Sequence, residues 1–222
     1  MNNDFTVGIG IGIIKTILGY PLDTIKTNYQ NNPHYKITMK NIYNGVKFPL
    51  TCNVVNNSLM FYLNTYIQNI FNKHYINAVN NNYISGFITG TIISPIINIF
   101  DLHKIQYQTN NYTKLQLSNL GISSTLMKES IYTSLYFGTF HKLKEYNVNP
   151  YLNGGITGTI SWLCIYPIDV IKTRIQSKKY DCYYQAFRCG NLWKGISICL
   201  SRSFIINSIS LPIYNYLQNY QK

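Results

Sequence analysis

Acidic residues are scarce in this sequence. Its 222 residues include 7 aspartates and glutamates against 19 lysines and arginines, which gives a formal net charge of +12. A chain this basic favours an anionic partner or substrate over a cationic one. Only 12% of the residues are charged and 15% are aromatic, so the excess charge does not belong to a disordered basic tail.

Residues that carry enzymatic or metal chemistry are also sparse. The 5 cysteines form no C-x-x-C pair, which argues against a disulfide framework and a zinc site. The 4 histidines are scattered and stand in no catalytic or metal-ligand spacing. We therefore expect no enzyme, no cofactor and no metal. The opening MNNDFTVGIG resembles neither a secretory signal nor an Arg-rich transit peptide, so no cleaved presequence is expected.

Long apolar runs are missing as well. No segment offers the roughly 20 consecutive apolar residues that cross a bilayer unaided, and the mean hydropathy is −0.07. A simple single-span protein is therefore excluded. A multi-helix membrane protein remains open, because a helix that turns one polar face to a water-filled cavity need not be apolar all round.

The sequence does contain a pattern that occurs three times. A proline, replaced in one copy by isoleucine, is followed by an aspartate two residues later and a lysine five residues later. The copies are Pro21, Asp23 and Lys26; Ile99, Asp101 and Lys104; and Pro167, Asp169 and Lys172. Two glycines precede each copy at matching offsets: Gly8 and Gly12; Gly86 and Gly90; Gly154 and Gly158. This predicts one domain, 1–222, made of repeats 1–77, 78–148 and 149–222.

Each repeat is expected to contain two long helices and a polar linker with a short amphipathic helix. The expected long helices cover residues 5–30, 48–71, 82–107, 122–144, 152–177 and 196–218. Segments of this length can cross a bilayer with some tilt. The paired glycines share a helix face and allow a neighbouring helix to approach closely. Basic residues collect in the linkers, which places them on the positive-inside side and both termini opposite.

These motifs, in register and each followed by an aromatic-x-Gly segment or a remnant of one, resemble the mitochondrial carrier family over essentially the whole chain. The resemblance implies an all-α membrane protein. Six transmembrane helices would form three pseudo-symmetric repeats around a central cavity, with short matrix-side amphipathic helices. It also implies a multi-pass monomer of the mitochondrial inner membrane that works by alternating access. A soluble nucleic-acid binder would fit the charge but not the glycine register.

The resemblance assigns the repeated acids and lysines to a gate on the matrix side. Each aspartate would pair with the lysine of another repeat: Asp23 with Lys104, Asp101 with Lys172, and Asp169 with Lys26. A lone charge in hydrocarbon costs about 2.5–3.5 kcal/mol on insertion, so each needs a partner. We expect Pro21, Pro95 and Pro167 to kink the gate helices.

The family usually closes the opposite end with an aromatic-acid-x-x-Lys motif on each even-numbered helix. The corresponding positions hold no acid: Asn64, Thr65 and Gln68; Phe140, His141 and Lys144; Tyr214, Asn215 and Gln218. We therefore expect hydrogen bonds to hold this gate, and the substrate-free protein to prefer the state open on the side of the termini.

Substrate residues are expected midway along the even-numbered helices. The resemblance points to Cys52, Asn53, Lys128, Glu129, Arg202 and Ser203, and Lys15 is a further candidate for a cavity cation. Lys128, Arg202 and Lys15 would suit phosphate or carboxylate groups. The neighbours Lys128 and Glu129, in contrast, are similar to the pair found in amino-acid carriers.

The aromatic-x-Gly segments lie where even-numbered helices begin, and in the family such helix N-termini commonly bind cardiolipin phosphates. The candidates here are Gly45 in the first repeat, and Trp193, Lys194 and Gly195 in the third. Membrane lipid is therefore an expected partner.

The compact chain, with its AT-rich type of composition, resembles a carrier encoded by a giant DNA virus, which would place it in a host mitochondrion. Together with the cationic cavity, this predicts exchange of small anionic metabolites, with nucleotides or deoxynucleotides favoured. Two alternatives remain. Lys128 and Glu129 favour an amino acid or a carboxylate, and the missing acids leave room for a membrane adaptor without transport.

Overall fold

The computed structural model describes residues 2–31, 43, 46–74, 78–109, 122–176 and 182–220. Within these ranges the chain forms helices and no strands. The helices are α1 (Asn2–Asn31), α3 (Lys47–His74), α4 (Ala78–Thr109), α5 (Ile122–Glu145), α6 (Pro150–Gln176), α7 (Tyr183–Arg188) and α8 (Ile196–Tyr220). All six expected long helices are present. The short α7 stands in the third linker, and the other two linkers lie largely outside the described residues.

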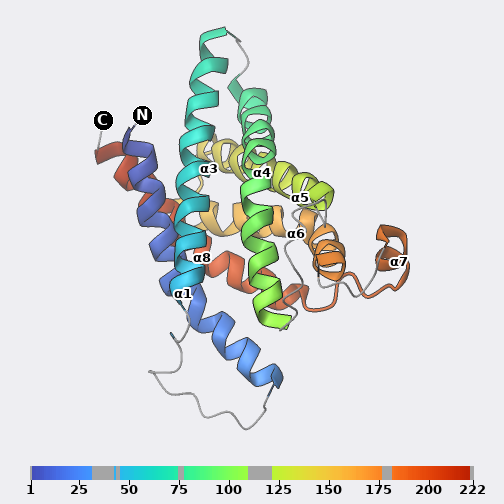
Figure 1. Cartoon of the computed structure of the whole chain (residues 1–222). Coiled ribbons are helices and arrows are strands. Elements are labelled where there is room, and N and C mark those ends of the chain that lie inside the picture. The colour runs from blue at the N-terminus through green and yellow to red at the C-terminus, as the bar shows by residue number, and fades with distance from the viewer. Residues whose placement is uncertain are drawn as a thin grey trace.

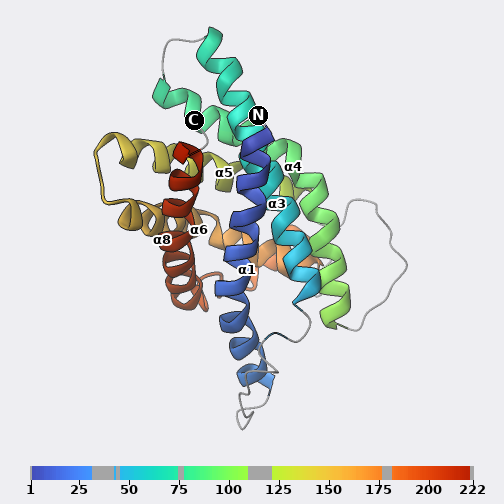
Figure 2. The ribbon, with the colours of Figure 1, turned by 90° about the vertical axis from the view of Figure 1, so that its left-hand side faces the viewer.

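The long helices close into a ring (Figures 1 and 2). Each packs on the next in the order α1, α3, α4, α5, α6 and α8, and α8 returns to contact α1. The two chain ends lie side by side at one end of the ring, which we call the termini end. The other end, where α6 stops and α8 begins, is called the linker end.

The glycine pairs bring the two helices of each repeat into close contact. A Cβ atom on Gly8 would lie 2.5 Å from the Ser58 Cα atom, and one on Gly12 would lie 2.6 Å from the Val54 Cα atom. Gly86 and Gly90 meet the backbone of α5, and Gly154 meets that of α8, in the same way. A side chain at these positions would push the helices apart. The close approach predicted from the sequence is therefore present.

Prolines stand inside four of the described helices: Pro21 in α1, Pro95 in α4, Pro167 in α6 and Pro212 in α8. A proline removes one backbone donor and crowds the preceding turn. Tightly packed neighbouring helices make such a defect tolerable in a membrane helix. The kinks at the first three positions stay a prediction, and Pro212 was not singled out from the sequence.

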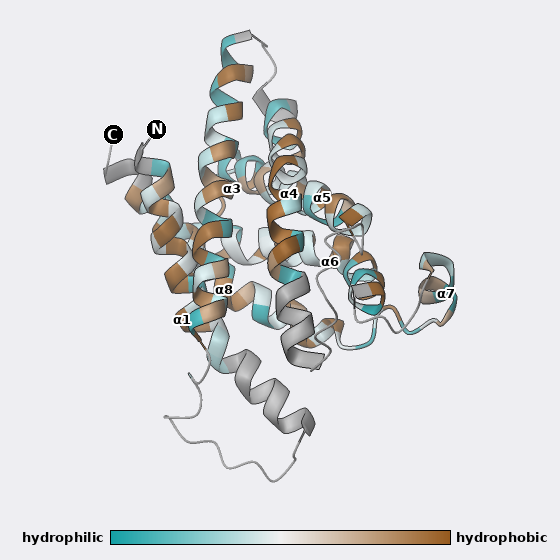
Figure 3. Cartoon of the chain, in the orientation of Figure 1, coloured by the Kyte–Doolittle hydropathy of each residue, from teal (hydrophilic) through white to brown (hydrophobic). Residues whose placement is uncertain are grey.

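Three described helical segments are long and apolar enough to cross a membrane: Asn81–Asp101, Pro150–Ile175 and Ile196–Leu217. They belong to α4, α6 and α8. Helix α3 mixes hydrophilic and hydrophobic residues along its length (Figure 3), as its cluster Asn53, Asn56 and Asn57 illustrates. Polar side chains that face the inside of the ring lower the hydropathy of a helix without exposing those groups to lipid.

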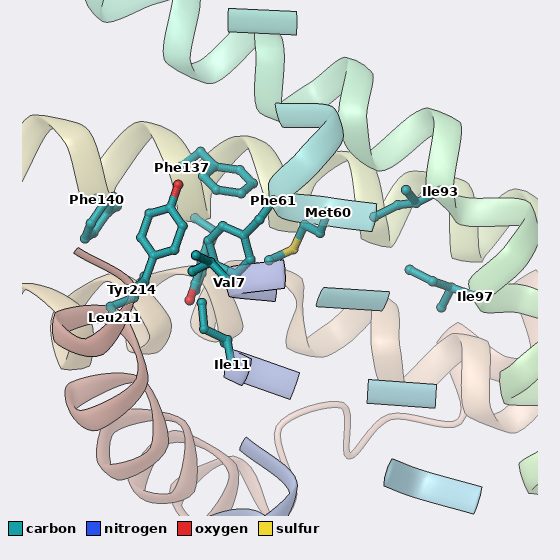
Figure 4. Packing of buried hydrophobic residues seen from close by; sticks show 11 residues of the cluster. Val7, Ile11, Met60, Phe61, Ile93, Ile97, Phe137, Phe140, Leu211 and Tyr214 are labelled. Carbon is teal, nitrogen blue, oxygen red and sulfur yellow. The ribbon is translucent and has the colours of Figure 1, made fainter. Parts of the chain in front are cut away.

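A cluster of buried aromatic and aliphatic side chains packs between the long helices (Figure 4), and most of its residues belong to the helix halves nearer the termini end. Its members are Val7, Ile11, Met60, Phe61, Ile93, Ile97, Tyr136, Phe137, Phe140, Leu211 and Tyr214. Phe61 lies at its centre, stacked on Tyr214 at 4.4 Å between ring centroids and edge-on to Phe137 at 5.6 Å. We call this group the aromatic cluster.

Candidate substrate cavity and gates

A polar cavity lies between the aromatic cluster and the linker end. Its volume is about 190 Å³, and α1, α3, α5, α6 and α8 all contribute to its wall. The lining residues are Lys15, Asn53, Asn56, Asn57, Met60, Lys128, Glu129, Tyr132, Trp162, Ile165, Arg202, Ser203, Ile206 and Asn207. The wall thus carries three cationic side chains and one carboxylate.

Six of the seven expected substrate residues line this cavity: Lys15, Asn53, Lys128, Glu129, Arg202 and Ser203. Cys52 does not, although it precedes Asn53 directly. Successive residues of an α-helix point about 100° apart, because a turn takes 3.6 residues. Asn53 faces inward and donates a hydrogen bond to the Thr16 hydroxyl at 3.0 Å, which sets the rotation of α3 and takes Cys52 off the cavity wall.

Lys128 contacts two carboxylates and an aromatic ring. Its ammonium lies 3.0 Å from an Asp169 carboxylate oxygen and 3.3 Å from a Glu129 carboxylate oxygen. It also sits over the Trp162 ring, 5.7 Å from the centroid. Glu129 is buried, with 5% of its surface exposed. One lysine therefore neutralises a carboxylate of the cavity and a carboxylate of the repeated motif at the same time.

The structure forms one of the ion pairs that the family resemblance implied. The Lys172 ammonium is hydrogen-bonded to the Asp101 carboxylate and joins α6 to α4. Lys172 is only 1% exposed, so its charge depends on this partner. The role of the pair as a gate stays a prediction.

Asp169 was expected to pair with Lys26, and among the described residues the structure places it against Lys128. The side chain of Lys26 lies outside the described residues, as do those of Asp23 and Lys104, so the remaining expected pairs fall there too. The new contact joins α5 to α6, whereas the expected one would have joined α1 to α6. Sequence reasoning treated Lys128 as a substrate residue only and missed its second partner.

A polar chain across the cavity was also missed. Lys15 Nζ donates to the Tyr136 hydroxyl at 3.4 Å, and that hydroxyl donates to Asn207 Oδ1 at 3.1 Å. These contacts tie α1, α5 and α8 together at the edge of the aromatic cluster, to which Tyr136 itself belongs. Asn57 and Asn207 each stand one helical turn beyond an expected substrate position, Asn53 and Ser203 respectively. Residues four apart share a helix face, so this spacing could have predicted that Asn57 and Asn207 face the cavity.

At the termini end, the expected hydrogen bonds are accompanied by apolar packing. Gln68 Nε2 donates to Asn82 Oδ1 at 2.8 Å and lies 3.3 Å from His141 Nε2, and Ser85 donates to Asn64 Oδ1 at 3.1 Å. The aromatic cluster packs between the helices on this side, and the preference of the substrate-free protein for the state open there stays a prediction. Phe61 and Phe137, one helical turn below Asn64 and Phe140, pack edge to face within this cluster.

The expected lipid segment forms the turn before α8. Gly195 has φ = +86°, a conformation that side chains disfavour. The Tyr166 hydroxyl donates to the Lys194 carbonyl at 2.7 Å, and its ring stacks on that of Trp193, which is 53% exposed. Gly45 lies outside the described residues. Lipid binding at this turn stays a prediction.

A ring of long helices around a charged internal cavity, with ion pairs at one end and packed aromatic rings at the other, defines a helical solute carrier. The family model described as "Mitochondrial carrier protein" matches residues 145–222. The "Mitochondrial carrier-like protein L276" of Acanthamoeba polyphaga mimivirus is 30% identical over 225 residues, covering 91% of this chain and 92% of the relative. The chain belongs to the mitochondrial carrier family.

Two further relatives extend the likeness. "Solute carrier family 25 member 45" of Mus musculus is 24% identical over 279 residues, with 96% of this chain and 97% of the relative covered. "Mitochondrial arginine transporter BAC2" of Arabidopsis thaliana is 23% identical over 263 residues, with 95% and 88% covered. The similarity therefore extends over almost the full length of this chain and over most of each relative.

Proposed function

We propose that this protein carries a small amino acid with a cationic side chain across the mitochondrial inner membrane by alternating access. All six long helices would cross the membrane as three repeats, 1–77, 78–148 and 149–222, and the chain would act as a monomer. Cardiolipin would bind at the turn that contains Trp193, Lys194 and Gly195. This departs from the nucleotide exchange favoured by the sequence.

The observation that carries the proposal is the buried Glu129 on the same cavity wall as Arg202 and Lys15. An amino acid presents a carboxylate and an ammonium group a few bonds apart. Arginine and lysine side chains can hold the carboxylate by charge-assisted hydrogen bonds. Glu129 can hold a cationic group in the same way, and it has no such role toward a phosphate.

The size of the cavity supports a small solute. Its volume of about 190 Å³ is below the roughly 300–1,000 Å³ of pockets that bury drug-sized ligands. A nucleoside triphosphate would need a wider space than an amino acid. The arginine transporter among the relatives also favours this substrate class, and none of the three relatives' names mentions a nucleotide.

Nucleotide exchange remains the second candidate, because the cavity wall carries three cations and only one carboxylate. Excess positive charge suits phosphate groups. In this case Lys128 would leave Glu129 to bind phosphate, and Trp162, which Lys128 now covers, would be free to stack on a base.

The test is uptake into liposomes that contain the purified full chain. Labelled arginine and lysine are expected to exchange, and labelled ATP and dATP are expected not to. Glu129→Gln should reduce arginine uptake at least tenfold, whereas Glu145→Gln, on the exposed end of the same helix, should leave it unchanged. Uptake of nucleotides alone would overturn the amino-acid proposal. Normal insertion with no flux of any solute would favour the adaptor.

A further inference from the structure

Lys128 touches two carboxylates that belong to different parts of the protein. Glu129 lines the cavity, whereas Asp169 stands in the repeated motif of α6 and is not part of the cavity wall. The two ion pairs have similar lengths, 3.3 Å and 3.0 Å. Lys128 itself lines the cavity, so a solute inside the cavity can reach the same ammonium group.

We propose that Lys128 is the positioning residue through which the occupied cavity acts on the linker-end gate: a substrate carboxylate competes with Asp169 for its ammonium group. This rests on the proposed amino-acid substrate. When the substrate carboxylate draws Lys128 into the cavity, the contact between α5 and α6 weakens. When the cavity is empty, Lys128 returns to Asp169 and fastens these helices together.

The charged groups around Lys128 make the competition between Asp169 and a substrate carboxylate sensitive to small changes in energy. Two lysines, Lys128 and Lys172, stand against the three carboxylates of Glu129, Asp169 and Asp101, and all three carboxylates act electrostatically on Lys128. Its ammonium has three donors, so it can serve two carboxylates at once and can exchange one for a third. In such a buried pair, attraction and desolvation nearly cancel. A solute contact of ordinary strength is therefore enough to move Lys128 from Asp169 to the substrate.

The position of the contact gives it a mechanical consequence. Helix α6 is fastened to its neighbours at this level by two described ion pairs, Asp169 with Lys128 on α5 and Lys172 with Asp101 on α4. Among the described residues, release of the Asp169–Lys128 pair leaves the Lys172–Asp101 pair. Coupling is reciprocal, so if the substrate weakens the Lys128–Asp169 contact, removal of that contact must strengthen substrate binding by the same factor.

The decisive experiment measures KM and maximal rate of arginine exchange in proteoliposomes. Asp169→Asn should lower KM about fivefold, since couplings of this kind span about 5–150-fold, and should lower the maximal rate because one gate contact is lost. In the Lys128→Met background, Asp169→Asn should leave KM unchanged. Lys128→Arg should restore the dependence, which separates a role in coupling from one in folding.

Asp101→Asn is the matched control, because Asp101 has Lys172 as its direct partner. It should change the maximal rate with little change in KM. Equal lowering of KM by Asp101→Asn and Asp169→Asn, or an effect of Asp169→Asn that persists without Lys128, would overturn the proposal.

A second measurement needs no substrate and so separates failure of this inference from failure of the proposed function. Ser203→Cys is placed on the cavity wall of a chain whose native cysteines are replaced by serine. A membrane-impermeant thiol reagent added on the linker side should label it several-fold faster when Asp169→Asn is present. Lys142→Met, an exposed site on α5, should not accelerate labelling. Equal labelling rates in all three chains would show that the Lys128–Asp169 contact does not close this end.

Discussion

At the linker end of the cavity, two lysines and three carboxylates meet in a small space, whereas at the termini end Phe61, Phe137 and Tyr214 pack ring against ring. In the first arrangement we propose that a charged solute can replace one of the partners of Lys128. The second depends on shape, because aromatic packing offers a solute no charge to exchange with. The two ends therefore differ in how directly a charged substrate can act on them.

The largest effect is expected when the charged end is broken at Lys172. Lys172→Met removes the buried ammonium that pairs with Asp101, whose side chain is 33% exposed, so we expect a loss near the lower end of the about 3–5 kcal/mol that breaking a fully buried pair costs. Thermal unfolding of the purified protein should shift downward, and exchange should be lost. Lys142→Met serves as the exposed control. Adding Asp101→Asn removes the second charge and should recover much of the stability; a double variant no better than the single one would contradict the pairing.

The aromatic end is tested by Phe61→Ala. Phe61 is fully buried, and truncation of a buried Phe destabilises by about 3 kcal/mol through lost packing and a residual cavity. Thermal unfolding should report this loss, and a thiol reagent added on the termini side should reach a cysteine at Ser203. Phe48→Ala, an exposed site of the same helix, is the control. Unchanged labelling would mean that the aromatic cluster does not close this end.

The smallest effect is expected at the hydrogen bonds of the termini end. Gln68→Leu removes the contacts with Asn82 and His141 and should cost about 0.6 kcal/mol, the average for hydrogen bonds between membrane helices. Exchange should continue. Gln185→Leu on the exposed α7 is the control, and it measures how much stability an exposed glutamine-to-leucine change costs by itself. An effect of Gln68→Leu as large as that of Phe61→Ala would reverse the ranking and make hydrogen bonds the main closure, as the sequence first suggested.

These two ends also show how far sequence reasoning reached. The repeated motif and its resemblance to the carrier family were enough to expect the contact between Asp101 and Lys172, because each position of the motif can be read directly from the chain. The aromatic cluster was missed because Phe61 and Phe137 look like ordinary apolar helix residues. Nothing in their spacing distinguishes a side chain that faces lipid from one that faces the centre of the ring.

The sequence by itself determined the number and approximate length of the long helices and the glycine faces on which they pack, because both follow from a helical period that each segment carries within itself. The resemblance to the carrier family added seven expected substrate residues, six of which line the cavity. Only the tertiary structure decided that Asn53 and not Cys52 faces inward, that Lys128 joins Asp169, and that aromatic rings pack together toward the termini end. Those outcomes depend on how far each helix is rotated and shifted against its neighbours, and that is fixed by contacts between residues far apart in the chain.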